Sequence, residues 1–566
     1  MSPKIRFELG SDSYSDIPEI PIAYWVNDNF RKSFALGKIL GHVAEPRAGL
    51  ATGNNDLFER FWFEVAWNNI KFDAQSTEDT KNAKEKWYPC NSGGTFRKWS
   101  FNNELVVNWQ NDGYEIRHFV NGKGKLAARP QNTQFYFKKG LTWNKLSSNR
   151  FAAKFKEEGF IFDDTSRSIF VDESILRYLL ALLCSNVALY YLKVFNPTMS
   201  FTNGDISRIP FILDNEKKAN IEDIVDSCLL LSMDDWNDSE YSWDFTRHPL
   251  TEEHTMGKLI SYKYMEWEEK CQHRFDKLKE NEEEINRIFI DIYGMQDELK
   301  PDVQDKDVTV RLADKERDIR SLISYLVGVA MGRYSLDVPG LAYAGGKWDE
   351  SKYVSYQPDD DGIIPIYNGI GMEDGLTTVL IKLIKQIYGE DTYKQNIDFI
   401  AEALGKNNNE SSEESLNRYL NDGFYADHLK VYQKRPIYWL FTSGKKAGFK
   451  CLIYMHRYNE DTLARINAKY FLPESTRKKN ELEELNGKIA HAEGRDKVRL
   501  EKERQNLAAA YNEAIEYGQI LDHMANRYIS IDLDDGVKEN YAKFQGVEIV
   551  TDGGSKVKKD LLSPLK

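Results

Sequence analysis

Residues 87–113 read WYPCNSGGTFRKWSFNNELVVNWQNDG, and the interpretation of the N-terminal part of the chain starts from this stretch. It holds a Gly-Gly pair, an Arg-Lys-Trp step, and an apolar run that ends in Asn-Asp-Gly, a sequence typical of tight turns. Further out, the runs that begin at Arg60 and Gln134 alternate apolar and polar side chains, as half-buried strands do. We therefore expect short strands and loops over the first 215 residues.

The rest of the sequence contains several segments with different predicted secondary structure. The run from Asp172 to Asn196 has an acidic start and a proline stop, which predicts a buried helix. Residues 216–300 are acidic and helical in pattern, and a further helix should end near Gly332. Two β-rich runs around SGKKAG, within residues 435–458, indicate a hairpin. A charged segment with a tip at AEGR, residues 492–495, favours an antiparallel pair of helices.

These patterns predict a multidomain α+β protein. We expect a β-rich target-recognition domain, a helical acidic spacer, an α/β C-terminal domain, a helical hairpin and a C-terminal tail. The expected boundaries are 1–215, 216–300, 301–460, 461–530 and 531–566. A chain of 566 residues is too long for one core, which agrees with several domains.

Charge is distributed unevenly along the chain. The formal net charge is −13 and the sequence pI is about 5.4, which would normally argue against a nucleic-acid partner. Between Cys90 and Lys156, however, twelve basic residues face three acidic ones, a local charge of +9. Electrostatic attraction depends on where charges lie rather than on their sum. We therefore expect one strongly positive face on an otherwise negative protein.

Cysteine spacing and hydropathy indicate the compartment. The five cysteines lie far apart and form no Cys-x-x-Cys, so we expect neither a zinc ribbon nor a disulfide scaffold. No signal peptide follows Met1, and no apolar run approaches the ~18 residues that span a bilayer. We expect a soluble, cytoplasmic protein without a membrane partner.

Long, ordered stretches of this sequence resemble one family. They are IPIAYWV at Ile20, EPRAGLATGNNDLFERFWFEV at Glu45, WYPCNSGGTFRKW at Trp87, FNPTMSFTNGDISRIPF at Phe195, SWDFTRHPL at Ser242, GRYSLDVPGL at Gly332, YQKRPIYWLFTSGKKAGFKCLIYMHRY at Tyr432 and IDLDDGVKENYAKFQ at Ile531. They resemble the C-terminal half of the PglX family, the adenine-specific DNA methyltransferases of BREX phage-defence systems. The resemblance implies adenine N6 methylation of DNA by an intact enzyme about twice this length, with S-adenosylmethionine as the methyl donor.

The motifs of the methylating half are missing from this sequence. An enzyme of this kind needs an Asn-Pro-Pro-Tyr-like loop to hold a flipped adenine. The chain has no Pro-Pro, and its Asn196-Pro197 continues with Thr-Met. The Gly-x-Gly turns at Gly122 and Gly369 are weak candidates for a cofactor loop. We therefore predict no catalytic, cofactor-binding or metal-binding residues in this chain.

The predicted function is recognition of double-stranded DNA. Arginine and lysine contact phosphates or guanine edges, glycine permits close approach, and small polar residues read base edges. The candidate DNA-binding residues are Arg47, Thr52, Gly93, Gly94, Arg97, Lys98, Lys123, Lys125, Arg129, Lys138, Lys139, Lys145, Asn149, Arg150 and Arg208. For Trp99, packing in its own core is favoured over stacking on DNA. The resemblance adds the N-terminal methyltransferase half and other BREX proteins as partners.

Two alternative functions stay open at this point. The chain could be a protein-interaction scaffold whose acidic helices bind BREX components, or whose basic face binds a DNA-mimicking phage inhibitor. It could also be an active methyltransferase with an unrecognised site. Salt dependence of DNA binding and titration with S-adenosylmethionine discriminate among these possibilities.

Overall fold

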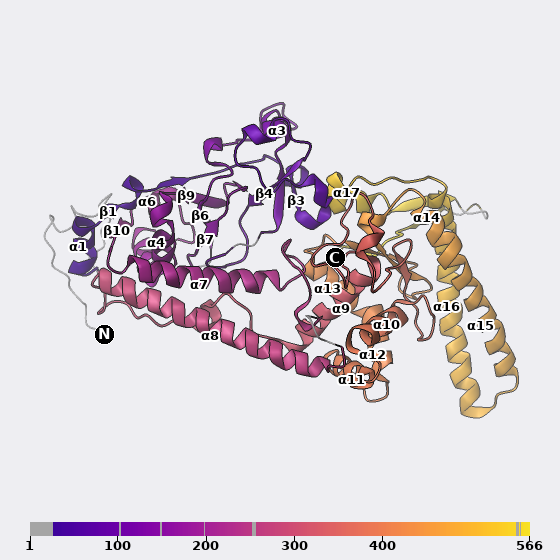
Figure 1. Cartoon of the computed structure of the whole chain (residues 1–566). Helices are drawn as coiled ribbons and strands as arrows, with labels where there is room; N and C mark the ends of the chain where they lie inside the picture. Colours follow the sequence, from indigo (N-terminus) through magenta and orange to yellow (C-terminus); the bar gives the residue numbers. More distant parts are fainter. Residues whose placement is uncertain are drawn as a thin grey trace, which may run out of the picture. The chain divides into compact units, whose positions relative to one another are not determined.

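The computed structural model describes residues 26–100, 103–147, 150–196, 198–251, 256–550, 554 and 556–565. The chain forms two compact units (Figure 1). The first comprises Met1–Trp62, Asn68–Trp243 and Glu268–Ala313, and the second comprises Phe63–Trp67, Asp244–Trp267 and Asp314–Lys566. Strands occur in small sheets beside many helices, so the mixed, multidomain α+β class predicted from the sequence is confirmed.

The first unit contains three small sheets. One has the order β2-β9-β6-β7, a second the order β3-β5-β4-β8, and the third pairs β1 with β10. The strands are β1 (Lys38–Ile39), β2 (Glu45–Arg47), β3 (Glu59–Phe61), β4 (Trp87–Asn91), β5 (Leu105–Asn108), β6 (Gly140–Asn144), β7 (Ala153–Lys156), β8 (Ile161–Phe162), β9 (Ser166–Phe170) and β10 (Pro210–Phe211). All their pairings are antiparallel except that of β4 with β8.

The helices of the first unit are concentrated after residue 170. They are α1 (Asp28–Leu36), α2 (Asn55–Phe58), α3 (Gln110–Arg117), α4 (Glu173–Cys184), α5 (Asn186–Phe195), α6 (Asn203–Ser207), α7 (Lys218–Asn237) and, from Glu268 onward, α8 (Ile260–Ile292). α7 and α8 lie side by side (Figure 1), where the Arg274–Asp238 ion pair of 2.7 Å and the Lys217–Asp291 ion pair connect them.

α4 and α5 supply much of the main hydrophobic core of this unit. The Asp172 side chain caps α4 by accepting a hydrogen bond from the Ser174 amide, as the sequence predicts. Ser185 breaks the predicted single helix because its hydroxyl caps α5. No single helix among the described residues is long and apolar enough to cross a membrane. α4 and α5 together have the length and composition, but they bend by 68° and are largely buried in the core.

The second unit combines helices with a three-stranded and a two-stranded sheet, in the orders β11-β13-β12 and β14-β15. Its strands are β11 (Ile363–Pro365), β12 (Tyr438–Thr442), β13 (Lys450–Tyr454), β14 (Val547–Val550) and β15 (Lys556–Lys559). Its helices are α9 (Lys315–Met331), α10 (Leu376–Tyr388), α11 (Tyr393–Ala403), α12 (Ser412–Asp422), α13 (Phe424–Val431), α14 (Thr462–Arg465), α15 (Leu472–Ala490), α16 (Gly494–Ala525) and α17 (Gly536–Ala542).

Three elements of the second unit agree with the sequence prediction. α9 ends at Met331 and is capped by Gly332, whose φ of 80° is the left-handed value that glycine adopts without strain. β12 and β13 form the predicted hairpin. α15 and α16 form the predicted helical hairpin, with the turn between Ala490 and Gly494 (Figure 1).

Candidate nucleic-acid interface

Six loops of the first unit form one connected set, which we call the loop surface. Its segments are residues 48–55, 91–95, 119–132, 144–147, 162–165 and 198–204. Backbone hydrogen bonds join neighbouring segments: Leu50 N to Phe162 O at 2.8 Å, Arg129 N to Ala51 O at 2.7 Å, Asp163 N to Asn91 O at 3.0 Å, Lys145 N to Thr165 O at 2.9 Å and Ser147 N to Met199 O at 2.9 Å. The loops are rich in Gly, Asn, Ser and Thr, which suits close approach to a polar polymer.

Asp163 holds the centre of the loop surface in place. Its carboxylate accepts hydrogen bonds from the amides of Thr165 (2.9 Å) and Ser166 (2.6 Å), and from the hydroxyls of Ser92 and Thr165 (both 2.7 Å). Burial raises the pKa of Asp163, and these bonds offset the effect only in part. The Thr165 hydroxyl accepts a hydrogen bond from the Gly93 amide at 2.8 Å, so the Gly-Gly segment is fixed through Asp163.

The glycine and threonine candidates shape this surface. Gly93 and Gly94 are exposed, and the Gly94 carbonyl accepts a bond from the Asn144 amide group at 2.8 Å. Thr52 is buried and donates to the Asn55 side chain, so it orders its loop from within. Asn149 lies outside the described residues.

Arg97 and Lys98 point into the protein instead of toward solvent. Each is 8% exposed. Arg97 forms a 2.6 Å ion pair with Asp235 and lies over the Trp236 ring at 5.0 Å. Lys98 forms a 2.6 Å ion pair with Glu282. Burial disfavours the ammonium, but the Glu282 carboxylate outweighs it and raises the pKa of Lys98.

Trp99 shares the partner of Lys98. It is fully buried, and its indole N–H donates to the second Glu282 oxygen at 2.8 Å. The packing role favoured for this residue from the sequence is therefore confirmed. The Arg-Lys-Trp step as a whole anchors the loop surface to α7 and α8.

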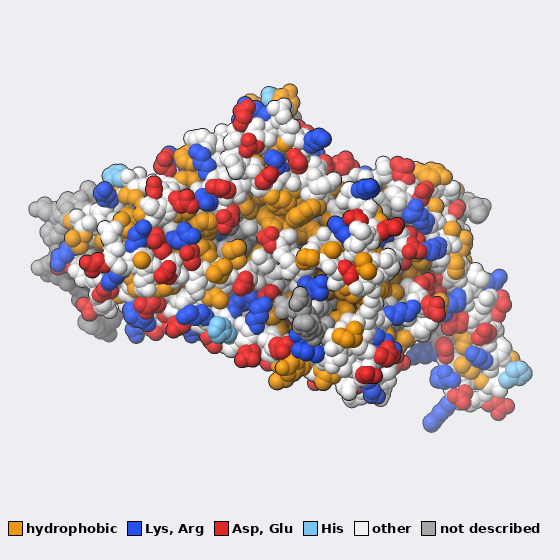
Figure 2. Space-filling model, viewed as in Figure 1, with side chains coloured by type: hydrophobic (Ala, Val, Ile, Leu, Met, Phe, Trp, Pro, Cys, Tyr) orange, Lys and Arg blue, Asp and Glu red, His pale blue; other side chains and the backbone are white. Residues whose placement is uncertain are grey.

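Most of the other basic candidates have acidic partners. The pairs are Arg47 with Glu45, Lys139 with Glu173 at 3.1 Å, Lys145 with Asp164 at 3.2 Å, Arg150 with Asp307 at 3.1 Å and Arg208 with Asp205 at 2.7 Å. Two more cations of the same window, Lys154 and Lys156, are buried. The local charge of +9 is therefore much smaller at the surface. Figure 2 agrees, because basic and acidic side chains are interspersed over the described residues that it displays.

Four basic candidates remain exposed without an ion pair to any described residue: Lys123, Lys125, Arg129 and Lys138. Lys123 and Lys125 lie at the tip of the hairpin 119–127. Arg129 follows that hairpin, and its backbone forms two hydrogen bonds with Ala51. Lys138 lies over the Phe135 ring at 5.5 Å. Lys123, Lys125 and Arg129 thus share one segment of the loop surface.

Two features of this interface do not follow from the sequence analysis, and the first is an exposed apolar pair on the hairpin. Val120 and Leu126 are 53% and 68% exposed and lie opposite one another. Their symmetric positions on either side of Asn-Gly-Lys-Gly-Lys are the sequence signal for the pair, whereas the Gly-Lys-Gly segment alone predicts only a polar loop. The sequence also gave no indication that Asp235 and Glu282 would neutralise the Arg-Lys step.

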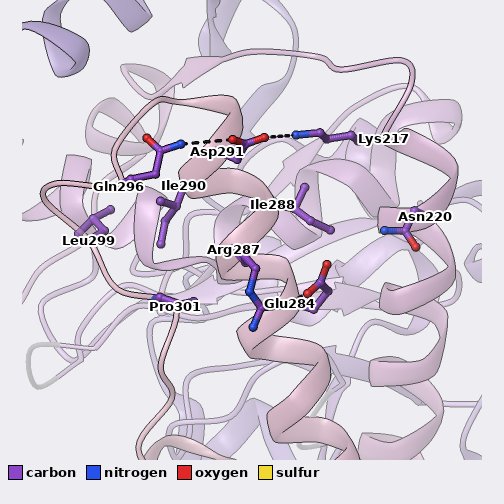
Figure 3. A pocket seen from close by; sticks show the side chains of 10 residues that line it. All are labelled: Lys217, Asn220, Glu284, Arg287, Ile288, Ile290, Asp291, Gln296, Leu299 and Pro301. Carbon is purple, nitrogen blue, oxygen red and sulfur yellow. Dashed lines mark hydrogen bonds and ion pairs between the residues drawn. The ribbon is translucent and has the colours of Figure 1, made fainter.

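The surface groove in Figure 3 is lined by charged and apolar side chains of α7, α8 and the segment after α8. It measures about 600 Å³ and lies between α7, α8 and the segment that follows α8. Its charged groups pair with one another, Lys217 with Asp291 and Arg287 with Glu284. Across the described ranges, no three His, Cys, Asp or Glu side chains come together in an arrangement that would hold a metal ion.

Neither Gly-x-Gly turn fits S-adenosylmethionine. Gly122 and Gly124 lie at an exposed hairpin tip. The turn at Gly369 follows β11, which pairs antiparallel with β13, and Ile370 within it is 39% exposed. A nucleotide-type site needs a turn between a buried parallel strand and a helix. The residues at both turns lack that arrangement, so no step of methyl transfer is assigned to them.

Comparison with known proteins identifies the class of this chain. No protein-family model matches the sequence. It is 39% identical over 543 residues to the adenine-specific methyltransferase PglX of Lacticaseibacillus casei (strain Zhang), and 36% identical over 565 residues to the adenine-specific methyltransferase BrxX of Escherichia coli O9:H4 (strain HS). Each match covers 94% of this chain and 45% of the relative, so the chain spans less than half the length of these curated relatives.

Both relatives are named adenine-specific methyltransferases. This chain corresponds to the C-terminal part of a PglX-like protein.

Proposed function

We propose that this chain is the DNA-recognition part of a BREX-type adenine-specific DNA methyltransferase. The loop surface of the first unit contacts double-stranded DNA, while catalysis with S-adenosylmethionine belongs to a methyltransferase half outside this chain. The similarity to two adenine-specific methyltransferases supports the substrate class. Neither Gly-x-Gly turn has the strand-turn-helix arrangement that S-adenosylmethionine needs, which supports assigning catalysis to another part of the enzyme.

The exposed basic residues of one segment indicate which part of the loop surface contacts DNA. Lys123, Lys125 and Arg129 are exposed, lie on one segment of the loop surface, and have no acidic partner among the described residues. Phosphate contacts need cations that are free to exchange their counterions for a phosphate. The proposed contact therefore centres on residues 119–132 and leaves out Arg97 and Lys98, whose charges are neutralised inside the protein.

Salt dependence of duplex binding tests the proposal. The triple variant K123A/K125A/R129A removes three phosphate contacts. The slope of log affinity against log salt should therefore become shallower by about 2–3, because each contact contributes roughly 0.9. Binding of the full chain to a 30-bp duplex would be measured by fluorescence anisotropy at several salt concentrations.

A matched control comes from three exposed lysines of the same unit, Lys32, Lys38 and Lys300. The variant K32A/K38A/K300A should keep the wild-type slope. Affinity that is independent of salt, or equal slopes for the two triple variants, would overturn the proposal. Heat released on titrating this chain with S-adenosylmethionine would instead favour a complete methyltransferase site.

A further inference from the structure

The hairpin 119–127, which we call the finger, is a short two-stranded ribbon held by hydrogen bonds between its two strands. The Asn121 amide donates to the Lys125 carbonyl at 2.9 Å, and the Ala127 amide donates to the Phe119 carbonyl at 3.0 Å. At the tip, the Asn121 side chain accepts bonds from the amides of Lys123 (2.9 Å) and Lys125 (3.3 Å). This arrangement fixes the turn without help from the rest of the protein.

The base of the finger is packed against the first unit. The Phe119 ring meets the Phe58 ring edge-on at 5.2 Å. A Cβ on Gly53 would lie 2.9 Å from the Ala127 Cβ, so glycine is needed for this close approach. Phe119 and Ala127 are partners across the ribbon, and therefore their shared face is the one turned toward the protein.

The opposite face carries an exposed apolar pair. Val120 and Leu126 are directly opposite each other, between the two hydrogen-bonded pairs, where cross-strand side chains approach most closely. They are 53% and 68% exposed. Single exposed apolar residues are ordinary in proteins. Here two of them are held together on a fixed ribbon beside a basic tip.

The tip leaves room for a ligand to approach. A Cβ built on Gly122 or Gly124 would meet nothing within 4 Å, and Gly124 has a φ of 70°. Lys123 and Lys125 flank these glycines and have no ion pair with a described residue. A narrow, basic, two-stranded ribbon has the dimensions that the major groove of DNA admits.

We propose that the finger enters the major groove of the DNA duplex and that the Val120–Leu126 pair reads the methyl group of thymine. Lys123 and Lys125 contact the phosphates on the two sides of the groove. Apolar contact with the thymine methyl is a recognised means of base readout, and positively charged side chains complement the groove edges. This inference rests on the proposed function, since it assigns a base preference to the surface that binds DNA.

A selection experiment tests the inference. Wild type and the variant V120T/L126T, each as the full chain, would select binding sites from a random-sequence duplex pool. Threonine keeps the ribbon but shortens the apolar surface. Wild type should enrich a motif, and the variant should bind with an unchanged salt slope but show a weaker A·T preference at one or two adjacent positions. L36Q/L230Q, which changes two exposed leucines elsewhere in the unit, should select the full motif.

Replacing thymine by deoxyuridine at the affected positions removes only the methyl group. Wild type should then lose about 5–10-fold in affinity, whereas V120T/L126T, which has less apolar surface, should lose clearly less. K123Q/K125Q should keep the motif and show a shallower salt slope. Equal thermal unfolding midpoints for wild type and V120T/L126T would establish that the variant is folded.

The outcomes separate the two proposals. An identical motif and identical sensitivity to deoxyuridine in wild type and V120T/L126T would overturn the role of the finger and leave DNA recognition intact. Failure of wild-type protein to bind any duplex would overturn the proposed function itself. A change in A·T preference in L36Q/L230Q equal to that in V120T/L126T would also overturn the role of the finger.

Discussion

Asp235 is one of two buried acids, with Glu282, that anchor the loop surface. It is fully buried, and its carboxylate lies 2.6 Å from Arg97, 3.2 Å from Arg311 and 3.5 Å from Arg274. Burial raises its pKa, but the three guanidinium groups outweigh burial and hold the pKa below the usual value. Its contribution to stability is therefore present above about pH 4 and is lost as pH falls through the lowered pKa.

Asp235→Asn should lower the free energy of unfolding at pH 7 by about 3–5 kcal/mol, because buried arginines lose their counter-charge. Urea denaturation followed by tryptophan fluorescence measures the change. The neighbouring exposed Asp234 provides the control, and D234N should stay within about 0.5 kcal/mol of wild type. Equal effects of the two variants would contradict a buried ion network.

Lys156 is a fully buried lysine whose ammonium group donates to the Lys138 carbonyl at 2.6 Å. Burial lowers the pKa of Lys156 to about 7. The unfolded chain binds the proton up to about pH 10. Between these values the unfolded state holds more protons, so stability should rise with pH.

Lys156→Met should remove this rise in stability. Its advantage over wild type should be largest at pH 7 or below and should shrink by about 1 kcal/mol per pH unit toward pH 10. Urea midpoints at pH 6, 8 and 10 measure it. Loss of the exposed Lys138 side chain, in K138M, serves as the control. A constant difference between K156M and wild type across pH would show that Lys156 is charged in the folded protein throughout.

The sequence shows which residues have side chains suited to DNA, but it does not show which of them are exposed. Lys123, Lys125 and Arg129 are exposed as expected, since they follow turn residues in a polar segment. Arg97 and Lys98 have the same sequence character but find their acids 138 and 184 positions away. No local window contains that information, so charge counting overstated the positive surface.

At the scale of helices and strands, local sequence patterns are sufficient to predict several elements. α9 and its glycine cap, the β12–β13 hairpin and the α15–α16 pair follow from periodicity and turn residues. The run that begins at Gln134 was predicted as one strand, yet only Gly140–Asn144 is a strand. The chain turns at Phe137, where φ is 67°, and this non-glycine turn has no sequence signature.

The loop between β8 and β9 is the element that keeps the loop surface ordered. Asp163→Ala removes the carboxylate that accepts four hydrogen bonds. The Thr165 hydroxyl is then no longer held in place, so its bond with the Gly93 amide weakens. Amide exchange over residues 91–95 should therefore accelerate by about 10–100-fold, as expected for a lost local ~1–3 kcal/mol. Hydrogen-exchange mass spectrometry measures it. D73A, which removes an exposed ion pair with Lys71, should leave this segment unchanged.

At the scale of the whole molecule, the proposed function requires a protein of net charge −13 to bind a polyanion through a small basic segment. The range of electrostatics depends on salt, with a Debye length of about 30 Å at 0.01 M and about 8 Å at 0.15 M. Under this proposal, carboxylates farther than about 8 Å from the bound DNA oppose its approach at low salt and are screened at physiological salt. The finger and the loops beside it act over short distances at both.

Neutralising exposed carboxylates tests this balance. The variant E483Q/E484Q/E493Q removes three negative charges from the α15–α16 hairpin and its turn. Its association with a 30-bp duplex should be about 2–5-fold faster than wild type at 0.01 M salt and unchanged at 0.15 M. K123A/K125A/R129A should slow association at both salts, since it alters the contact itself. Stopped-flow anisotropy measures these rates. An equal acceleration of the glutamine variant at both salts would mean that the helical hairpin, rather than the loop surface alone, lies against the bound DNA.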